Sequence, residues 1–214
     1  MNSLERVDPP TGPPRDVRQR RVLLVLAVVS LLFAVIAVTI VVTRDRRQPP
    51  APSAIGGPFS LIATDGSTVT DRTYAGKWEL VYFGYTFCPD ACPTALSDMS
   101  LALEKLGPKA TQVKPLFITV DPTRDTAAVL ADYLKSFDPR IVGLTGSEPQ
   151  TIAAAAAYHI YVKSQSGGGG GYLVYHSAYV YVMDPYGRFV DVIDGATAGD
   201  AMAAKLETMM DQYL

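Results

Sequence analysis

The chain has 214 residues, of which 48% are hydrophobic, and a formal net charge of −2. This length accommodates one ordinary domain and an additional segment. Residues 1–47 hold 8 of the 19 basic and 4 of the 21 acidic residues, so the remainder carries 11 basic and 17 acidic residues and a net charge of −6. An acidic domain without a basic stripe binds nucleic acid poorly, and we expect no nucleic-acid partner.

An uncharged apolar run of 21 residues, Val22 to Val42, lies near the N-terminus. As a helix it would span roughly 31 Å, about the thickness of the hydrocarbon core of a bilayer. A cleaved signal peptide is the alternative, but its apolar core is shorter, roughly 7–15 residues, and no convincing cleavage site follows the run. Five arginines precede the run and three follow it, which favours a cytoplasmic N-terminus. We expect a single-pass anchor in the inner membrane, with the C-terminal domain in the periplasm.

Composition divides the chain into four parts. We expect a cytoplasmic tail over residues 1–21, a transmembrane anchor over 22–43, a proline-rich linker over 44–57 and a globular domain over 58–214.

The globular part alternates strand-like and helix-like segments. Residues 59–70 predict a hairpin that turns at Asp65-Gly66, and two apolar runs, 78–86 and 113–120, predict buried strands. A short strand is expected over 141–144 and a terminal hairpin over 178–193. Helices are expected over 93–107, 126–137, 149–157 and 198–213. This order predicts an α/β domain with helices packed on a mixed sheet.

The two cysteines of the chain, Cys88 and Cys92, lie in GYTFCPDACPTAL (84–96), where a strand leads into a helix. Positions i and i+4 share a helix face, so the sulfurs can approach each other. The pair can form a disulfide, or bind one soft metal ion as thiolates. A helix N-terminus lowers thiol pKa values and favours both outcomes. A purely structural disulfide or two buried thiols is the remaining alternative, although so small a loop stabilises a fold little.

A third ligand must come from elsewhere, and the chain has two histidines. His159 ends the alanine-rich helix, where a surface or capping role is the simpler interpretation. His176 precedes a buried strand, and loops at strand ends carry sites. Two cysteines and one histidine are one ligand short of a closed zinc site. Three ligands rich in sulfur suit Cu(I), and an imidazole lets the site hold Cu(II) as well.

These residues resemble the Sco/SenC family of copper proteins, which have a thioredoxin-like fold. Three motifs match in order: GYTFCPDACP, VDPTRDT (120–126), and His176 followed by Tyr179, Asp184, Pro185 and Gly187. The resemblance covers residues 55–214. It implies that Cys88, Cys92 and His176 bind one copper ion per domain. It also implies delivery of copper to the binuclear copper site of cytochrome c oxidase subunit II, or reduction of the cysteines of that site. Another copper chaperone is the candidate donor.

A membrane-tethered thiol–disulfide oxidoreductase or peroxide-handling enzyme is the alternative, with Cys88 and Cys92 as its redox pair and no stable metal. Thioredoxin-like oxidoreductases use Cys-x-x-Cys facing a cis-proline. Here the spacing is one residue longer, and VYHSAYVYV has a histidine about where that proline would stand. The sequence therefore favours metal binding over plain disulfide exchange.

Three acidic or basic residues near the motifs are candidates for a supporting role. Asp90 either tunes the site or meets a partner, or it is a turn residue. Asp121 and Arg124 either form an ion pair near the site, or belong to a plain loop in which Thr123 or Asp125 caps the next helix.

One departure from the family pattern precedes the histidine. The segment SQSGGGGGYLVY replaces a loop that is usually polar and often acidic. We expect the run Gly167–Gly171 to form a mobile loop that carries His176 and adds an entropic cost to closure over the metal.

Overall fold

The structure, a computed structural model, describes residues 15–45, 55–166 and 172–212, and the chain divides into two units at residue 49. In the first unit, helix α1 (Arg15–Asp45) contains the whole apolar run. Its segment Gln19–Ile36 is apolar and long enough to cross a membrane, with a mean hydropathy of 2.1. This helix fits the single membrane span expected from the sequence. The tail before residue 15 and most of the expected linker, residues 46–54, lie outside the described residues.

A seven-stranded mixed sheet forms the centre of the second unit, in the order β2-β1-β5-β4-β3-β8-β9. Strands β3, β4 and β5 run parallel, and β1 and β8 flank them in the antiparallel direction. The strands are β1 (Ser60–Ala63), β2 (Thr68–Thr70), β3 (Trp78–Gly84), β4 (Val113–Thr119), β5 (Val142–Thr145), β8 (Tyr179–Met183) and β9 (Phe189–Asp194).

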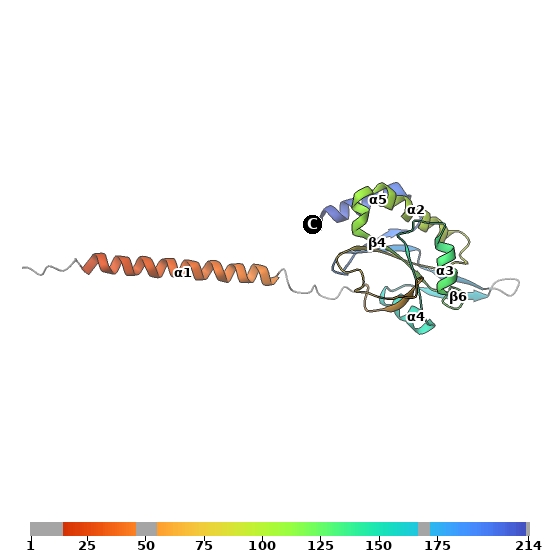
Figure 1. Ribbon diagram of the computed structural model, residues 1–214, viewed down its shortest axis with the longest axis horizontal. Helices are drawn as coiled ribbons and strands as arrows, with labels where there is room; N and C mark the ends of the chain where they lie inside the picture. Colours follow the sequence, from red (N-terminus) through yellow and green to blue (C-terminus); the bar gives the residue numbers. More distant parts are fainter. Residues whose placement is uncertain (1–14, 46–54, 167–171, 213–214) are drawn as a thin grey trace, which may run out of the picture. The chain divides into compact units, whose positions relative to one another are not determined.

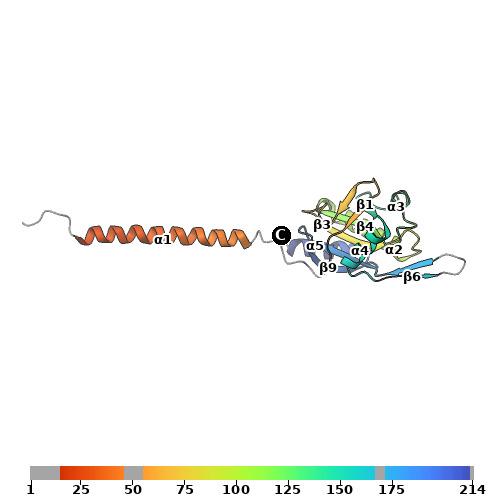
Figure 2. The ribbon, with the colours of Figure 1, turned by 90° about the horizontal axis from the view of Figure 1, so that it is seen from below.

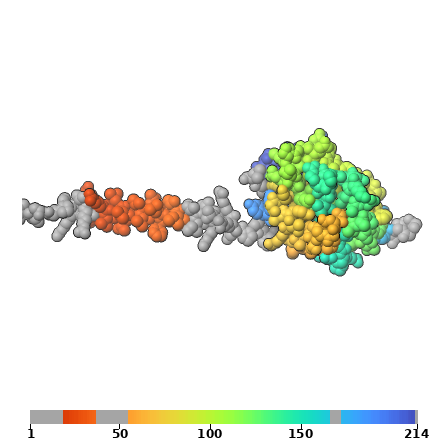
Figure 3. All heavy atoms as spheres, in the orientation of Figure 1, coloured from red at the N-terminus to blue at the C-terminus, as the bar shows by residue number. Residues whose placement is uncertain are grey.

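Helices cover both faces of this sheet, because successive residues of its inner strands point to opposite sides. In β3, Leu80 and Tyr82 face the core under α2 (Ala91–Lys105), α3 (Ala127–Leu134) and α5 (Gly199–Gln212). Val81 and Phe83 face the opposite core, under α4 (Glu148–Ala157). Figure 1 shows α2 and α5 together on one side of the sheet and α4 on the other. Figure 3 shows all heavy atoms in the same orientation, with the light-green and yellow parts of the sequence both at the surface of the globular unit.

Most of the expected elements are confirmed, including the β1–β2 hairpin, the two buried strands and the terminal β8–β9 hairpin. The third helix is shorter than expected, because α3 ends at Leu134. Lys135, Ser136 and Phe137 follow it with hydrogen bonds to the third residue before them, which is a tightened turn rather than an α-helical one. A short 3₁₀ helix, η1 (Gly107–Gln112), links α2 to β4.

The expectation that His176 lies in a mobile loop is wrong. Residues on both sides of the glycine run form an antiparallel pair, β6 (Val162–Ser166) and β7 (Tyr172–His176), with Val162 opposite His176. This pair is a sheet of its own and projects from the body of the domain (Figure 2). The run Gly167–Gly171 lies outside the described residues.

Candidate metal centre

The cysteines lie on a segment that continues the buried strand β3, and we refer to residues 84–92 as the cysteine arm. The backbone N–H of Cys88 donates to the carbonyl of Tyr85 at 3.2 Å, and that of Cys92 donates to Cys88 Sγ at 3.4 Å. Cys92 lies in the first turn of α2 and is fully buried, whereas Cys88 is half-buried. Both are free thiols. One sulfur is therefore held inside the fold, and the other is accessible.

Gly84 leaves the space that the sulfur of Cys92 occupies. A Cβ at this position would lie 2.9 Å from Cys92 Sγ and 2.6 Å from the ring of Phe117. Real Cβ contacts are essentially never this short. The end of β3 must therefore be glycine for the helix to bring Cys92 this close.

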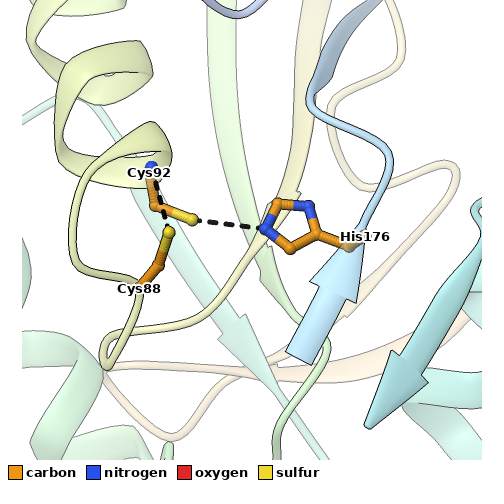
Figure 4. A group of neighbouring side chains, drawn as sticks. All are labelled: Cys88, Cys92 and His176. Carbon is orange, nitrogen blue, oxygen red and sulfur yellow. Dashed lines mark hydrogen bonds between the residues drawn. The ribbon is translucent and has the colours of Figure 1, made fainter. Parts of the chain in front are cut away.

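The histidine comes from the hairpin β6–β7, which we call the histidine arm. Nε2 of His176 lies 3.4 Å from Cys92 Sγ, and Nδ1 lies 3.1 Å from the carbonyl oxygen of Ser177. A carbonyl only accepts, so Nδ1 carries the hydrogen and Nε2 presents its lone pair towards the sulfur. Figure 4 shows both sulfurs and the imidazole directed into one space. This tautomer is the one that a metal-binding imidazole requires.

Two sulfurs and one nitrogen together form a donor set that fits a soft metal ion. The ligand atoms of Cys88, Cys92 and His176 all lie within 4.8 Å of one another. Ligands at about 2.0–2.3 Å from one ion are at most about 4.6 Å apart, so small adjustments would enclose it. Across the described ranges, no other group of three His, Cys, Asp or Glu side chains meets this criterion. His159 is not in this group. It follows α4 as an exposed residue with φ 55°.

The two thiols differ in acidity. A hydrogen bond from the Cys92 thiol, supported by the backbone N–H groups of Cys92 and Asp90, lowers the pKa of Cys88 to about 4. The hydrogen bond to Cys88 and burial raise the pKa of Cys92. The pair therefore holds one proton at neutral pH, with Cys88 as the thiolate. A metal ion that engages both sulfurs must displace the proton of Cys92.

Aromatic rings surround the imidazole and the buried sulfur. Tyr82 and Tyr85 meet the ring of His176 edge-on, with centroids 6.1 and 6.0 Å away. The hydroxyl of Tyr82 donates to Cys92 Sγ at 3.9 Å. Sequence reasoning assigned these tyrosines to the core alone. Tyr82 could have been identified from the alternation of side chains along β3. Residues two apart in a strand share a face, so Tyr82 lies on the same face as Gly84, under α2.

Asp90 is exposed and occupies the N-cap position of α2, but its side chain makes no capping hydrogen bond. It lines a pocket of about 280 Å³ beside Cys88 and His176. Asp90 is therefore placed to meet whatever approaches the sulfurs.

The other supporting candidates form a buried network instead of a plain loop. Asp121 and Arg124 are an ion pair, which lies against aromatic rings and not against the sulfurs. Asp125 does not cap α3, because its buried carboxylate accepts hydrogen bonds from Thr86 and Thr119. The cap is Thr126, which accepts from the N–H of Val129.

The model of the SCO1/SenC family matches residues 47–211 of this chain. "Protein SCO1 homolog 1, mitochondrial" of Arabidopsis thaliana is 43% identical over 139 residues, which are 64% of this chain and 42% of that protein. The human "Protein SCO1 homolog, mitochondrial" is 36% identical over 173 residues, 79% of this chain and 58% of that protein. "Protein SenC" of Rhodobacter capsulatus is 40% identical over 161 residues, 75% of this chain and 73% of that protein. The chain thus spans less than two thirds of the two mitochondrial proteins.

Solved structures share the fold of the globular unit. ScoI of Bradyrhizobium japonicum, determined with copper bound, is 42% identical with a TM-score of 0.69, and the match covers 73% of this chain and 99% of that one. ScoI of Arabidopsis thaliana, also with copper bound, is 39% identical with a TM-score of 0.71, over 75% of this chain and 100% of that one. The thioredoxin-like fold expected from the sequence is confirmed.

Proposed function

The chain belongs to the SCO1/SenC family, and from this premise we propose that it is a membrane-anchored copper-binding protein of cytochrome c oxidase assembly. It delivers copper to the binuclear copper site of subunit II, or reduces the cysteines of that site. The observation that carries this proposal is the meeting of Cys88, Cys92 and His176 within 4.8 Å. Similar chains whose structures contain copper support the choice of metal.

Cys88 and Cys92 supply thiolate sulfurs and His176 supplies Nε2, with one copper ion per chain. Two thiolates are sufficient for Cu(I), which accepts few soft ligands, and the imidazole adds the nitrogen that Cu(II) prefers. The accessible thiolate of Cys88 is the point at which an acceptor thiol can begin to displace copper. The acidic side chain of Asp90 stands at the same opening and faces that acceptor.

In this proposal the apolar helix α1 anchors the chain in the inner membrane, and the excess of arginines before it favours a cytoplasmic N-terminus. The globular unit, residues 58–214, then works in the periplasm. A copper chaperone in the same compartment is the donor. Such a tether keeps the globular unit near the membrane, on the same side as the proposed acceptor site.

The alternative, a thiol–disulfide oxidoreductase without a stable metal, is less well supported. In such a reaction Cys88 and Cys92 would lose two electrons and two protons to form a disulfide, and a disulfide in the target would become two thiols. That exchange requires no imidazole with a free lone pair beside the buried sulfur. His176 therefore separates the two functions: a dithiol reductase tolerates His176→Ala, whereas a Cu(II) carrier does not.

The first test is copper stoichiometry. The full chain in detergent, reduced and then titrated with Cu(I), should bind one equivalent, and Cys88→Ser/Cys92→Ser should bind none. Oxidation of the pair to a disulfide should also abolish binding, because a disulfide offers no thiolate. Stoichiometric copper retained by the double variant would overturn the site.

The second test concerns the acceptor. Copper-loaded chain is mixed with the reduced, metal-free copper domain of subunit II from the same organism, and the binuclear copper absorption is followed. Metal-free chain is mixed in parallel with the oxidised domain, and free thiols on the acceptor are trapped and counted. Absorption in the first mixture supports delivery, and new acceptor thiols in the second support reduction. The absence of both signals would overturn subunit II as the partner.

A further inference from the structure

The ligands of the candidate centre come from two different sheets, so something other than strand pairing must hold them together. The cysteine arm continues β3 of the main sheet, whereas β7, which ends at His176, pairs only with β6 among the described strands. One direct link is the N–H of Val174, which donates to the hydroxyl of Tyr85 at 3.4 Å. This long hydrogen bond and the edge-on ring contacts of His176 with Tyr82 and Tyr85 are weak restraints on a projecting hairpin.

Arg124, in the turn after β4, contacts both arms. On the histidine arm, its Nη1 donates to the carbonyl of Tyr172 at 3.1 Å, and its guanidinium stacks 3.8 Å from the centroid of the Tyr172 ring. On the cysteine arm, the same guanidinium lies 4.7 Å from the ring of Phe87 and 5.6 Å from that of Tyr85. Phe87 directly precedes Cys88. One side chain thus joins the segment before the first cysteine to the strand that ends at the histidine.

Contacts made by Asp121 and Asp125, in the same turn, fix the position of Arg124. Asp121 is 4% exposed, pairs with the guanidinium through Nε, and accepts a hydrogen bond from the hydroxyl of Tyr172 at 2.7 Å. In the same turn, Asp125 holds the backbone N–H and the hydroxyl of Thr86 on the cysteine arm. Nη2 of Arg124 is buried without a hydrogen-bond partner, so the aromatic faces carry the remaining stabilisation of its charge.

We propose that Arg124 is a positioning residue that latches the histidine arm onto the cysteine arm and thereby sets how well His176 reaches a metal held by the two sulfurs. The proposal deepens the proposed function and rests on it. A guanidinium suits this position because its plane stacks on aromatic rings while its edges still donate hydrogen bonds. Release of the latch leaves both sulfurs in place, because Cys88 and Cys92 depend on β3 and α2. It frees the hairpin, so the imidazole must be ordered when the metal binds.

The latch predicts a selective effect on the two oxidation states of copper. Cu(I) binds to the two thiolates in Arg124→Met as in the wild type, within about threefold. Cu(II) affinity falls about 10- to 100-fold, which is the usual loss when a residue that orients a metal ligand is changed. The nitrogen hyperfine coupling in the Cu(II) spin-resonance spectrum weakens for the same reason. A change that merely loosened the fold would lower both affinities together.

The experiment uses the full chain in detergent and a matched control, Arg140→Met. Arg140 also pairs with an aspartate, Asp138, but it lines a surface groove that contains none of the three candidate ligands. Cu(I) affinity is measured by competition with a colorimetric chelator and Cu(II) affinity from the thiolate-to-copper charge-transfer band. We expect Arg140→Met to match the wild type in both measurements. Equal loss of Cu(I) and Cu(II) in Arg124→Met, or no loss of either, would overturn the latch.

A double variant tests whether Arg124 acts through the histidine. In an Arg124→Met/His176→Ala chain, the loss of Cu(II) affinity should equal that of His176→Ala alone, because there is no imidazole left to position. Additive losses would contradict the proposal.

If Arg124→Met does not fold, Tyr172→Phe removes only the hydroxyl that binds Asp121 and should lower Cu(II) affinity alone by a few-fold. If the wild type binds no copper, the proposed function fails first. If it binds copper and Arg124→Met behaves as Arg140→Met, only the latch fails.

Discussion

The cysteine arm and the histidine arm meet at one site but are built in opposite ways. Every residue of β3 is buried, and the cysteine arm continues directly from it into α2. In the histidine arm, Leu173 and Tyr175 are exposed and only Val174 of β7 is buried. An isolated two-stranded hairpin is at best marginally stable in water. The sulfur ligands are therefore preorganised by the core, whereas the nitrogen ligand depends on contacts across the gap between two sheets.

This difference suits a site that must give its metal away. A closed cage of rigid ligands would bind copper tightly and release it slowly, whereas one yielding ligand lowers the barrier to exchange. The contrast also assigns different tasks to the arms. Under the proposed function, the cysteine arm holds copper in either oxidation state, and the histidine arm discriminates between them. Four experiments challenge or refine this division.

The largest effect should come from removing the imidazole. His176→Ala should lower Cu(II) affinity by more than the roughly 10- to 100-fold that follows loss of an orienting contact, while Cu(I) stays bound to the two thiolates. A Cu(II) titration followed by the charge-transfer band measures the loss. His159→Ala is the control, because His159 is exposed and outside the ligand group. Loss of the band in His159→Ala, with retention in His176→Ala, would reverse the assignment.

The second experiment tests how strongly the core buries β3, the strand from which the cysteine arm continues. Burial in β3 raises the pKa of Glu79 from 4.5 to about 7, with a smaller contribution from Asp71. At pH values between 4.5 and about 7, Glu79 is ionised in the unfolded chain but protonated in the folded chain. Glu79 therefore destabilises the fold increasingly as pH rises from about 5 to 8. The stability of Glu79→Gln relative to the wild type should therefore increase over this window by on the order of 2–3 kcal/mol.

Urea unfolding of the metal-free chain at pH 5 and pH 8 measures this difference, with the fluorescence of Trp78 as the probe. The ionisation of the cysteines cancels in the comparison, because both chains contain the same pair. A relative stability that does not change with pH would show that Glu79 is not held neutral by burial.

The third experiment disturbs the cysteine arm alone. Gly84→Ala places a methyl group 2.6 Å from the ring of Phe117 and 2.9 Å from Cys92 Sγ, and overpacking of this kind destabilises a fold by about 1–3 kcal/mol. Because the strain falls on a sulfur ligand, the affinities for Cu(I) and Cu(II) should fall together, in contrast to His176→Ala. Gly57→Ala is a matched control, since a Cβ there meets only Ala157 at 3.5 Å. A loss confined to Cu(II) would contradict the division between the arms.

The smallest effect should follow Tyr82→Phe, which removes the hydroxyl that donates to Cys92 Sγ. A hydrogen bond draws electron density from a thiolate, so its loss should strengthen the sulfur as a ligand of Cu(II). We expect the ratio of Cu(II) to Cu(I) affinity to rise by about three- to tenfold, because the bond is long and its acceptor is sulfur. The charge-transfer band should move to lower energy. Tyr133→Phe removes a buried hydroxyl without a hydrogen-bond partner and should leave the band in place.

The sequence by itself determined the features that depend on local patterns. The apolar run fixes a spanning helix because its length matches a bilayer. Continuous apolar runs rich in β-forming residues identify the strands that become β3 and β4. The position of Pro93 and the spacing of the apolar residues identify α2 and place Cys92 in its first turn. The position of His176 before a predicted buried strand also singled it out over His159, and the structure brings His176, not His159, to the two sulfurs.

Only the tertiary structure decided how the two arms meet. The glycine run indicated a loop, but the segments around it pair as β6 and β7, and strand pairing depends on partners and burial more than on intrinsic preference. Asp125 is a good helix cap by type, yet its carboxylate is taken by Thr86, which lies 39 residues earlier in the chain. Arg124 reaches Tyr172 across 48 residues of sequence. Contacts at such separations exist only after the sheets have packed, because their geometry is set by the fold and not by the spacing of residues along the chain.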